Sequence, residues 1–208
     1  MSERVRELYL QVLKSARRQF SRGLDQGGDV AAETARVLDL FPDLDHPPPF
    51  TVPEPKPSHP LLTPLSAFLK QHPDLVPGLA ELAPFLPWTY NYAPRADDPN
   101  LHERMGWFEF IGPDAPLHSL ELGFGIGFST GNVTYRPHIH PAAEIYCILA
   151  GHGDYHVDGE VRRLGPGDFS YHAPFAIHAA IRGDEPGMNI YSWTGDVVTL
   201  SKYVDEGI

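Results

Sequence analysis

The chain has 208 residues, of which 42% are hydrophobic, so it is long enough for one domain of ordinary size with its own core. Its 16 basic and 27 acidic residues give a net charge of -11, which argues against a nucleic-acid partner. The single cysteine, Cys147, cannot form an internal disulfide, and no apolar run approaches the roughly 20 residues of a membrane span. We therefore expect a cytoplasmic protein without a membrane segment.

The N-terminal segment predicts two amphipathic helices. Apolar residues recur at three- and four-residue steps between Ser2 and Arg22, and Gly23 provides a stop. A second helix is expected to begin after Asp29 and to end near Leu40. Stripes of this kind pack against the main domain or against another subunit, so the helices or the barrel edges could pair two chains in a homodimer.

A proline-rich connector follows, with eight prolines between residues 42 and 60. This density excludes helix and central strand and favours an extended, stiff segment. Thr63 and Pro64 then resemble the start of a helix, which Pro73 would stop. Residues 1–95 are therefore expected to form a helical extension or cap that contains a proline-rich connector.

Three aromatic residues crowd the segment from Pro87 to Tyr92, next to an expected loop. They would either fill the core beneath the helices or form an aromatic wall that binds a cation through its π faces. Core packing is the commoner outcome for such a cluster, and both interpretations stay open at this point.

The sequence changes character from Gly106 onward, where short β-type runs alternate with turn signals such as Asp158-Gly159. The expected strands are Trp107–Ile111, Leu117–Phe124, Gly131–His138, Glu144–Leu149, Gly153–Val157, Asp168–Tyr171, His178–Ile181 and Met188–Trp193. Many short strands at near-regular spacing indicate an all-β sandwich or barrel. Residues 96–208 are therefore expected to form a β-barrel domain, and the chain as a whole is expected to be mainly β.

One stretch of the β half carries candidate metal ligands. From Tyr135 to Tyr146 the sequence is Y-R-P-H-I-H-P-A-A-E-I-Y. Side chains two residues apart on a strand point to the same face, so His138 and His140 lie together, as do Glu144 and Tyr146. Imidazole nitrogens beside carboxylate and phenol oxygens suit a divalent transition metal.

Two longer patterns give this stretch a family resemblance. The pattern H-x-H-x3-E-x6-G runs from His138 to Gly151, and the pattern G-D-x5-P-x3-H runs from Gly167 to His178. Together they resemble the two signature motifs of the cupins, whose fold is a small jelly-roll barrel. The second pattern departs in detail, because its proline comes one place late and Phe175 stands where a glycine is usual.

The cupin resemblance implies that His140, Glu144 and His178 are metal ligands. It also makes His138 either a further ligand or a neighbour that orients substrate. Zinc or iron is the first expectation for the metal, and manganese, nickel or cobalt would also fit these ligands. The other nearby histidines are expected at the surface or in support of the ligands; they are His152, His156 and His172.

Tyr146 distinguishes this chain from many cupins, which place an aliphatic or other residue at that position. A free phenol has a pKa of about 10, too high for a base at neutral pH, but contact with a divalent cation favours the phenolate. Tyr146 is therefore a candidate metal ligand and general base, and the alternative is a plain wall residue.

Tyr135 and Trp193 complete a narrower resemblance. The order Y-x4-H-x3-E-x-Y, the late tryptophan and the helical extension are similar to the cupin-type dimethylsulfoniopropionate lyases. That family eliminates dimethyl sulfide from a small zwitterionic sulfonium substrate and leaves acrylate. The resemblance implies a carbon–sulfur lyase in which Tyr146 binds the metal and acts as the base, while Tyr135 assists or serves as the alternative base. Trp193, Tyr135 and His138 would bind substrate, with the tryptophan beside the sulfonium.

Two other function classes stay open from the sequence. A different metal-dependent cupin enzyme, such as a dioxygenase or a sugar-acid isomerase, would use the same ligands on another substrate. A non-catalytic cupin would hold metal or a small ligand and form no product.

Overall fold

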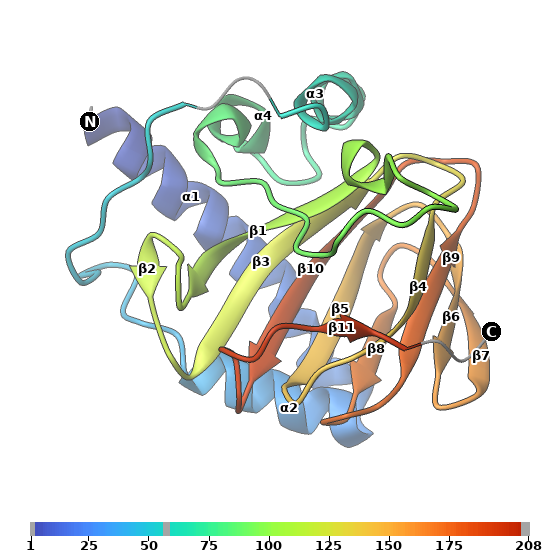
Figure 1. Cartoon of the computed structure of the whole chain (residues 1–208). Helices are drawn as coiled ribbons and strands as arrows, with labels where there is room; N and C mark the ends of the chain where they lie inside the picture. The colour runs from blue at the N-terminus through green and yellow to red at the C-terminus, as the bar shows by residue number, and fades with distance from the viewer. Residues whose placement is uncertain (1–2, 56–58, 205–208) are drawn as a thin grey trace.

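The computed structural model describes residues 3–55 and 59–204 (Figure 1). Its strands are β1 (Met105–Gly112), β2 (Leu117–His118), β3 (Leu122–Ser129), β4 (Thr134–Ile139), β5 (Ala143–Ala150), β6 (Gly153–Val157), β7 (Glu160–Leu164), β8 (Phe169–His172), β9 (His178–Arg182), β10 (Gly187–Thr194) and β11 (Lys202–Tyr203). Its helices are α1 (Glu3–Phe20), α2 (Gly28–Asp39), α3 (Leu62–Gln71) and α4 (Leu79–Leu82), with 3-10 turns at Ser21–Gln26, Ala83–Phe85 and Leu101–Glu103. Ser2 and residues 205–208 of the expected barrel domain lie outside the described residues.

The strands form two sheets that face each other. One sheet has the order β2-β1-β3-β10-β5-β8, and the other has the order β11-β4-β9-β6-β7. All pairings between these neighbours are antiparallel except that of β1 with β2. This is the jelly-roll barrel that the cupin motifs predict, so the mainly β class with N-terminal helices is confirmed.

Several strand boundaries differ from the expectation. The single strand expected over Leu117–Phe124 is two strands, β2 and β3, because a turn intervenes at Ser119. The Ser119 hydroxyl accepts hydrogen bonds from the backbone N–H groups of Glu121 and Leu122 and so fixes this turn. Strands β7 and β11 were not predicted, since the first is exposed along most of its length and the second is only two residues long.

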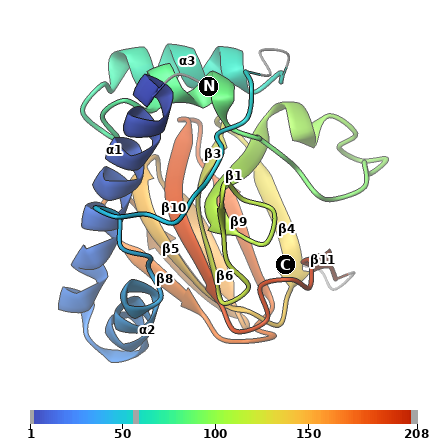
Figure 2. The ribbon, with the colours of Figure 1, turned by 90° about the vertical axis from the view of Figure 1, so that its left-hand side faces the viewer.

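The N-terminal helices pack on the outer face of the six-stranded sheet. Figure 2 shows α1 and α2 along one side of the sheets and α3 across one end. The ring of Phe20 on α1 packs edge to face on that of Phe124 on β3, with 5.4 Å between the ring centroids. Tyr9 on α1 packs in the same way on Phe110 of β1, at 5.3 Å. The helical stripe thus packs against the barrel of the same chain, and the boundary at residue 95 stays a prediction. None of the described helices is long and apolar enough to cross a membrane.

Strand β3 shapes the barrel interior through a strict alternation of glycine and large apolar residues. Its sequence is L-G-F-G-I-G-F-S, and the large residues Phe124, Ile126 and Phe128 are buried against the helical layer. Gly125 faces the other way, where a methyl group would lie 2.8 Å from the Tyr191 ring. Because the inner face of β3 carries no side chains over this length, space is left inside the barrel.

A β-bulge in β1 ties α1 to the barrel. Phe110 is the extra residue between the paired positions Glu109 and Ile111, so its carbonyl group is outside the ladder with β3. The hydroxyl of Tyr9 donates to this carbonyl oxygen at 2.5 Å, and the Tyr9 side chain is fully buried. One hydrogen bond therefore satisfies both the carbonyl oxygen of the bulge and the buried hydroxyl of Tyr9.

We expect Tyr9→Phe to lower the free energy of unfolding by about 1–3 kcal/mol, because the Phe110 carbonyl oxygen loses its buried donor. Tyr9→Ala should cost about 3–5 kcal/mol, since the ring contacts with Phe50 and Phe110 disappear as well. Urea unfolding followed by circular dichroism measures both changes, with Glu7→Ala at an exposed position of α1 as the control. Equal stability of Tyr9→Phe and wild type would show that this hydrogen bond does not help dock the helix.

Candidate functional site

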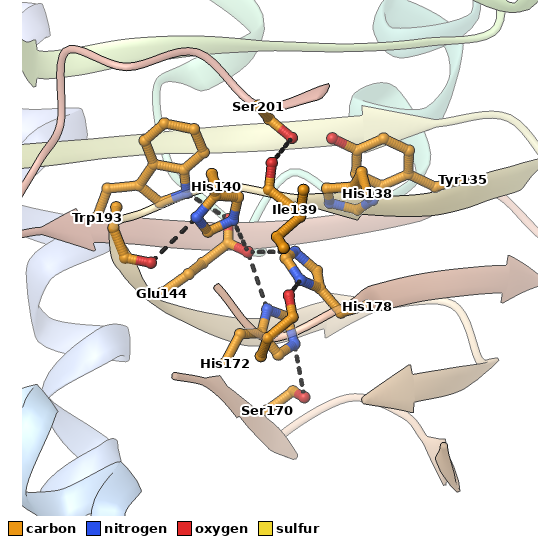
Figure 3. A network of polar contacts seen from close by, with 12 residues as sticks. Tyr135, His138, Ile139, His140, Glu144, Ser170, His172, His178, Trp193 and Ser201 are labelled. Carbon is orange, nitrogen blue, oxygen red and sulfur yellow. Dashed lines mark hydrogen bonds and ion pairs between the residues drawn. The ribbon is translucent and has the colours of Figure 1, made fainter. Parts of the chain in front are cut away.

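The residues of the two cupin-like motifs meet inside the barrel, although they come from both sheets. His138 on β4 pairs directly with His178 on β9, while Glu144 lies on β5 of the other sheet. Ligand atoms of His138, His140 and His178 lie within 4.8 Å of one another, and all three side chains are buried. Figure 3 shows these side chains turned toward one another around Glu144.

A backbone carbonyl orients each of these three histidines. The contacts are His138 Nδ1 with the Arg136 oxygen at 2.7 Å, His140 Nδ1 with the Ala142 oxygen at 3.0 Å, and His178 Nδ1 with the Ala176 oxygen at 2.9 Å. A carbonyl oxygen only accepts, so each Nδ1 carries the proton and donates it. Each Nε2 is therefore left with its lone pair, the form of histidine that ligates a metal.

Glu144 is the centre of the cluster. Its Oε2 lies 3.3 Å from His140 Nε2 and 3.1 Å from His178 Nε2, while its Oε1 accepts a hydrogen bond of 2.7 Å from Trp193 Nε1. Burial is the largest influence on the pKa of this carboxyl group and acts to raise it, whereas the proton that His172 donates to Oε2 acts to lower it.

The donor set fits a divalent metal. The buried Nε2 of His178 has no hydrogen-bond partner among the described residues, although the carboxylate of Glu144 is near it. Lone pairs of two imidazoles and a carboxylate directed at one another repel unless a cation lies between them. Borderline nitrogen and hard oxygen donors at such positions suit a transition metal. Burial also keeps the pKa of His138 well below its usual value, so that this histidine is neutral and able to ligate.

His172 belongs to the same cluster. The sequence placed it with His152 and His156, at the surface or in support of the ligands, and it is in fact buried against Glu144. Its Nδ1 donates to Glu144 Oε2 at 2.8 Å, and its Nε2 accepts from the Ser170 hydroxyl at 2.9 Å. Burial and the neighbouring His178 lower the pKa of His172 to about 4, so it is a neutral support for the carboxylate.

The sequence did not identify Ser170, although a signal for it exists. Strand β8 has the sequence F-S-Y-H, so Ser170 and His172 share one face, and they pair with Tyr146 and Glu144 of β5 in register. His152, by contrast, is exposed at the surface.

Both candidate tyrosines lie in the wall of the interior cavity. The Tyr146 ring is 4.8 Å from that of His172, and the Tyr135 ring stacks on His138 at 3.9 Å. Burial raises the pKa of both phenols well above the usual value. Without a nearby cation, both phenols are therefore protonated at neutral pH.

The aromatic segment before the barrel divides between the core and the cavity wall, and cation binding by the wall stays a prediction. Trp88 is buried in the core beside Phe108, at 4.8 Å between ring centroids. Tyr92 instead lies over the cavity, where its hydroxyl contacts that of Tyr135 at 2.7 Å and donates to Ser201 at 2.6 Å. One part of the segment fills the core and another part walls the site.

The cavity has a volume of about 350 Å³. It extends along the inner face of the six-stranded sheet from Glu144, which belongs to the cluster of candidate metal ligands, called the metal cluster below. Its walls come from the barrel strands, from the segment around Tyr92 and from the loop before β11. No residue of α1 to α4 lines it, whereas the segment around Tyr92, which belongs to the expected extension of residues 1–95, does.

Glu109 is a second acidic group in this cavity, and the sequence did not suggest it. It lies on β1 in the apolar run W-F-E-F-I, where a charged residue between aromatics was the available signal. Burial, and then the nearby charge of Asp114, raise the pKa of Glu109 to about 7, against a smaller lowering by its contact with Tyr191.

This shift predicts a pH-dependent stability. Between its ordinary pKa of 4.5 and about 7, Glu109 loses its proton in the unfolded chain but keeps it in the folded chain, so its presence lowers the free energy of unfolding as pH rises. Glu109→Gln should therefore be more stable than wild type by about 1–3 kcal/mol at pH 8 and equal to it at pH 4.5.

Urea unfolding at both pH values measures the difference, with exposed Glu160→Gln as the control. If Glu109→Gln differed from wild type by the same free energy of unfolding at both pH values, the raised pKa of Glu109 would be contradicted.

Comparison with known proteins agrees with this geometry. A family model for dimethylsulfoniopropionate lyases matches residues 35–188. The curated relative dimethylsulfoniopropionate lyase DddQ of Ruegeria pomeroyi is 30% identical over 154 residues, which are 70% of this chain and 77% of the relative.

Two solved structures resemble the chain over most of its length. The crystal structure of DMSP lyase DddQ from Ruegeria pomeroyi DSS-3 is 28% identical, with a TM-score of 0.61 over 83% of this chain and 93% of that one. A chain from the crystal structures of DMSP lyases RdDddP and RnDddQII is 21% identical, with a TM-score of 0.76 over 97% of this chain and 100% of that one. This second likeness supports the fold alone.

Proposed function

The chain belongs to the dimethylsulfoniopropionate lyase family, and on that premise we propose how its cavity carries out the reaction. The protein is a carbon–sulfur lyase that cleaves dimethylsulfoniopropionate into dimethyl sulfide and acrylate. The observation that supports the mechanism is that Glu144 contacts His140 and His178 and lines one cavity together with Tyr146 and Trp193.

His140, Glu144 and His178 would hold a divalent metal, with His138 as the further nitrogen donor and Tyr146 as the phenol oxygen. Zinc or iron suits this set first, and manganese, nickel or cobalt would also bind. When bound, the metal supplies a Lewis acid for the substrate carboxylate, which acidifies the neighbouring α-hydrogen, and a positive charge that favours a phenolate.

Tyr146 is the base of the proposed reaction. Its oxygen takes the α-proton, the electron pair of that C–H bond forms the carbon–carbon double bond, and the carbon–sulfur bond breaks. The sulfur leaves with the bonding pair as neutral dimethyl sulfide. Arg182 supports this role, because its charge acts to lower the pKa of Tyr146 against the larger effect of burial.

Tyr135 and Trp193 would position the substrate. The Tyr135 hydroxyl is hydrogen-bonded through Tyr92 to Ser201, so it can assist Tyr146 or receive the proton in its place. The Trp193 ring is held by its bond to Glu144 and by a 4.2 Å contact with His140. A ring fixed in the cavity wall in this way suits the sulfonium cation.

We expect Tyr146→Phe to lower kcat by a factor of about 10²–10⁴, because the reaction loses its general base. Gas chromatography of dimethyl sulfide released by metal-loaded protein measures the rate. Tyr171→Phe on the neighbouring strand is the matched control, since Tyr171 packs toward the helical layer. Turnover that survives intact in Tyr146→Phe would assign the base to another residue, with Tyr135→Phe as the next variant.

Removal of the metal by a chelator should abolish dimethyl sulfide release, and added zinc or ferrous iron should restore it. The variant His140→Ala should retain less than one equivalent of metal by elemental analysis, whereas exposed His152→Ala should match wild type. Full activity of the chelated protein would contradict a metal-dependent mechanism.

A cytoplasmic location and a homodimer are further parts of this proposal. Cys147 is buried, and burial raises the pKa of its thiol to about 12, which suits an unreactive core residue in a reducing compartment.

A further inference from the structure

Glu109 lies in the same cavity as the metal cluster but on the far side of Trp193. Strand pairing sets this arrangement: Trp193 lies between Glu144 of β5 and Gly123 of β3. A methyl group at Gly123 would be 3.2 Å from Glu109 Oε1 and also 3.2 Å from Trp193 Cβ. The Trp193 side chain therefore donates a hydrogen bond to Glu144 through its Nε1, while its Cβ and the Glu109 carboxylate both border Gly123.

The glycines of β3 create the space that the Glu109 side chain uses. Glu109 pairs with Gly125, so no side chain separates it from the ring of Tyr191 on β10. A side chain at Gly123 would press on the carboxylate and on Trp193 at once. Bare backbone on β3 thus lets a charged group on β1 reach the cavity beside the tryptophan.

This carboxylate has no cationic partner within the part of the chain that the structure describes. Arg182, the basic side chain in the cavity wall, lies on the opposite sheet and donates to Tyr155 and Asn189 instead. Asp114 lines the same end of the cavity and adds negative charge. Since a buried carboxylate without a cationic partner costs free energy, this end of the cavity suits a cation that the described residues do not supply.

We propose that Glu109 is the anionic partner of the substrate's sulfonium group and selects a cationic substrate at the Trp193 end of the cavity. The inference rests on the proposed function, because the sulfonium belongs to dimethylsulfoniopropionate. In that substrate three covalent bonds separate the carboxylate carbon from the sulfur, roughly 4 Å. With its carboxylate at the metal cluster, the substrate places its cation along the Trp193 ring toward Glu109.

The charge on Glu109 acts on binding more than on the chemical step. The substrate is cationic at sulfur, whereas dimethyl sulfide is neutral, so the attraction disappears when the carbon–sulfur bond breaks. An interaction made in the ground state and weakened along the reaction lowers KM without raising kcat. The charge on Glu109 also favours replacement of neutral dimethyl sulfide by a new substrate molecule.

A pair of unreactive ligands isolates this charge. The zwitterion 3-(trimethylammonio)propanoate and its isostere 4,4-dimethylpentanoate, which lacks the positive charge, share a carboxylate and a shape. Calorimetry measures the affinity of each for metal-loaded protein. Wild type should prefer the zwitterion. Glu109→Gln should bind the zwitterion on the order of ten-fold more weakly than wild type does, and ten-fold is about 1.4 kcal/mol. It should bind the isostere as wild type does.

Glu109→Asp, which keeps the charge, should retain most of the preference, and the exposed control Glu160→Gln should retain all of it. Glutamine at residue 109 removes a buried charge without a cavity, so we expect this variant to fold. An unchanged preference for the zwitterion in Glu109→Gln would overturn the proposal, as would an equal loss of affinity for both ligands.

Turnover of dimethylsulfoniopropionate gives an independent readout. Glu109→Gln should raise KM about ten-fold and leave kcat within a few-fold of wild type. A kcat reduced a thousand-fold at unchanged KM would overturn the proposal and make Glu109 the proton acceptor instead. Absence of dimethyl sulfide from wild type would refute the proposed reaction, while the ligand pair would still decide the role of Glu109.

Discussion

A single buried carboxylate, that of Glu144, organises the interior of this protein. It contacts two histidines with free lone pairs, accepts from His172 and from Trp193, and lies between the two sheets. Such a group is stable in a low-dielectric interior only when its partners are held in place. The barrel provides this, because neighbouring strands fix His172, Glu144 and Trp193 in one row across the sheet.

The same low dielectric sets the protonation of the other groups in the cavity. Burial keeps the phenols of Tyr135 and Tyr146 neutral and holds Glu109 partly protonated near neutral pH. A cation at the metal cluster would favour the charged form of the phenols. A cation beside Trp193 would favour the charged form of Glu109. The cavity is thus organised for a ligand that is negative at one end and positive at the other.

Local sequence patterns predicted which candidate residues lie near one another. The spacing of His138 and His140 and of Glu144 and Tyr146 places each pair on one face of a strand. The structure gathers the two histidines with His178 in one buried cluster, and it places Glu144 and Tyr146 in the cavity wall. The roles of all these residues stay predictions. The helical extension was predicted too, but its position behind the sheet was not, because an apolar stripe does not specify the surface it packs against.

The sequence by itself determined the fold class, the family and the main ligand candidates, since period-two alternation and short motifs are local properties of the chain. Only the tertiary structure placed Ser170 and His172 beneath Glu144, and Glu109 beside Trp193. These contacts depend on which strands are neighbours and on their register. Glu109 on β1 and Trp193 on β10 both border Gly123, because β3 runs between their strands with glycines on its inner face. This relation spans about 80 residues, and no local pattern encodes it.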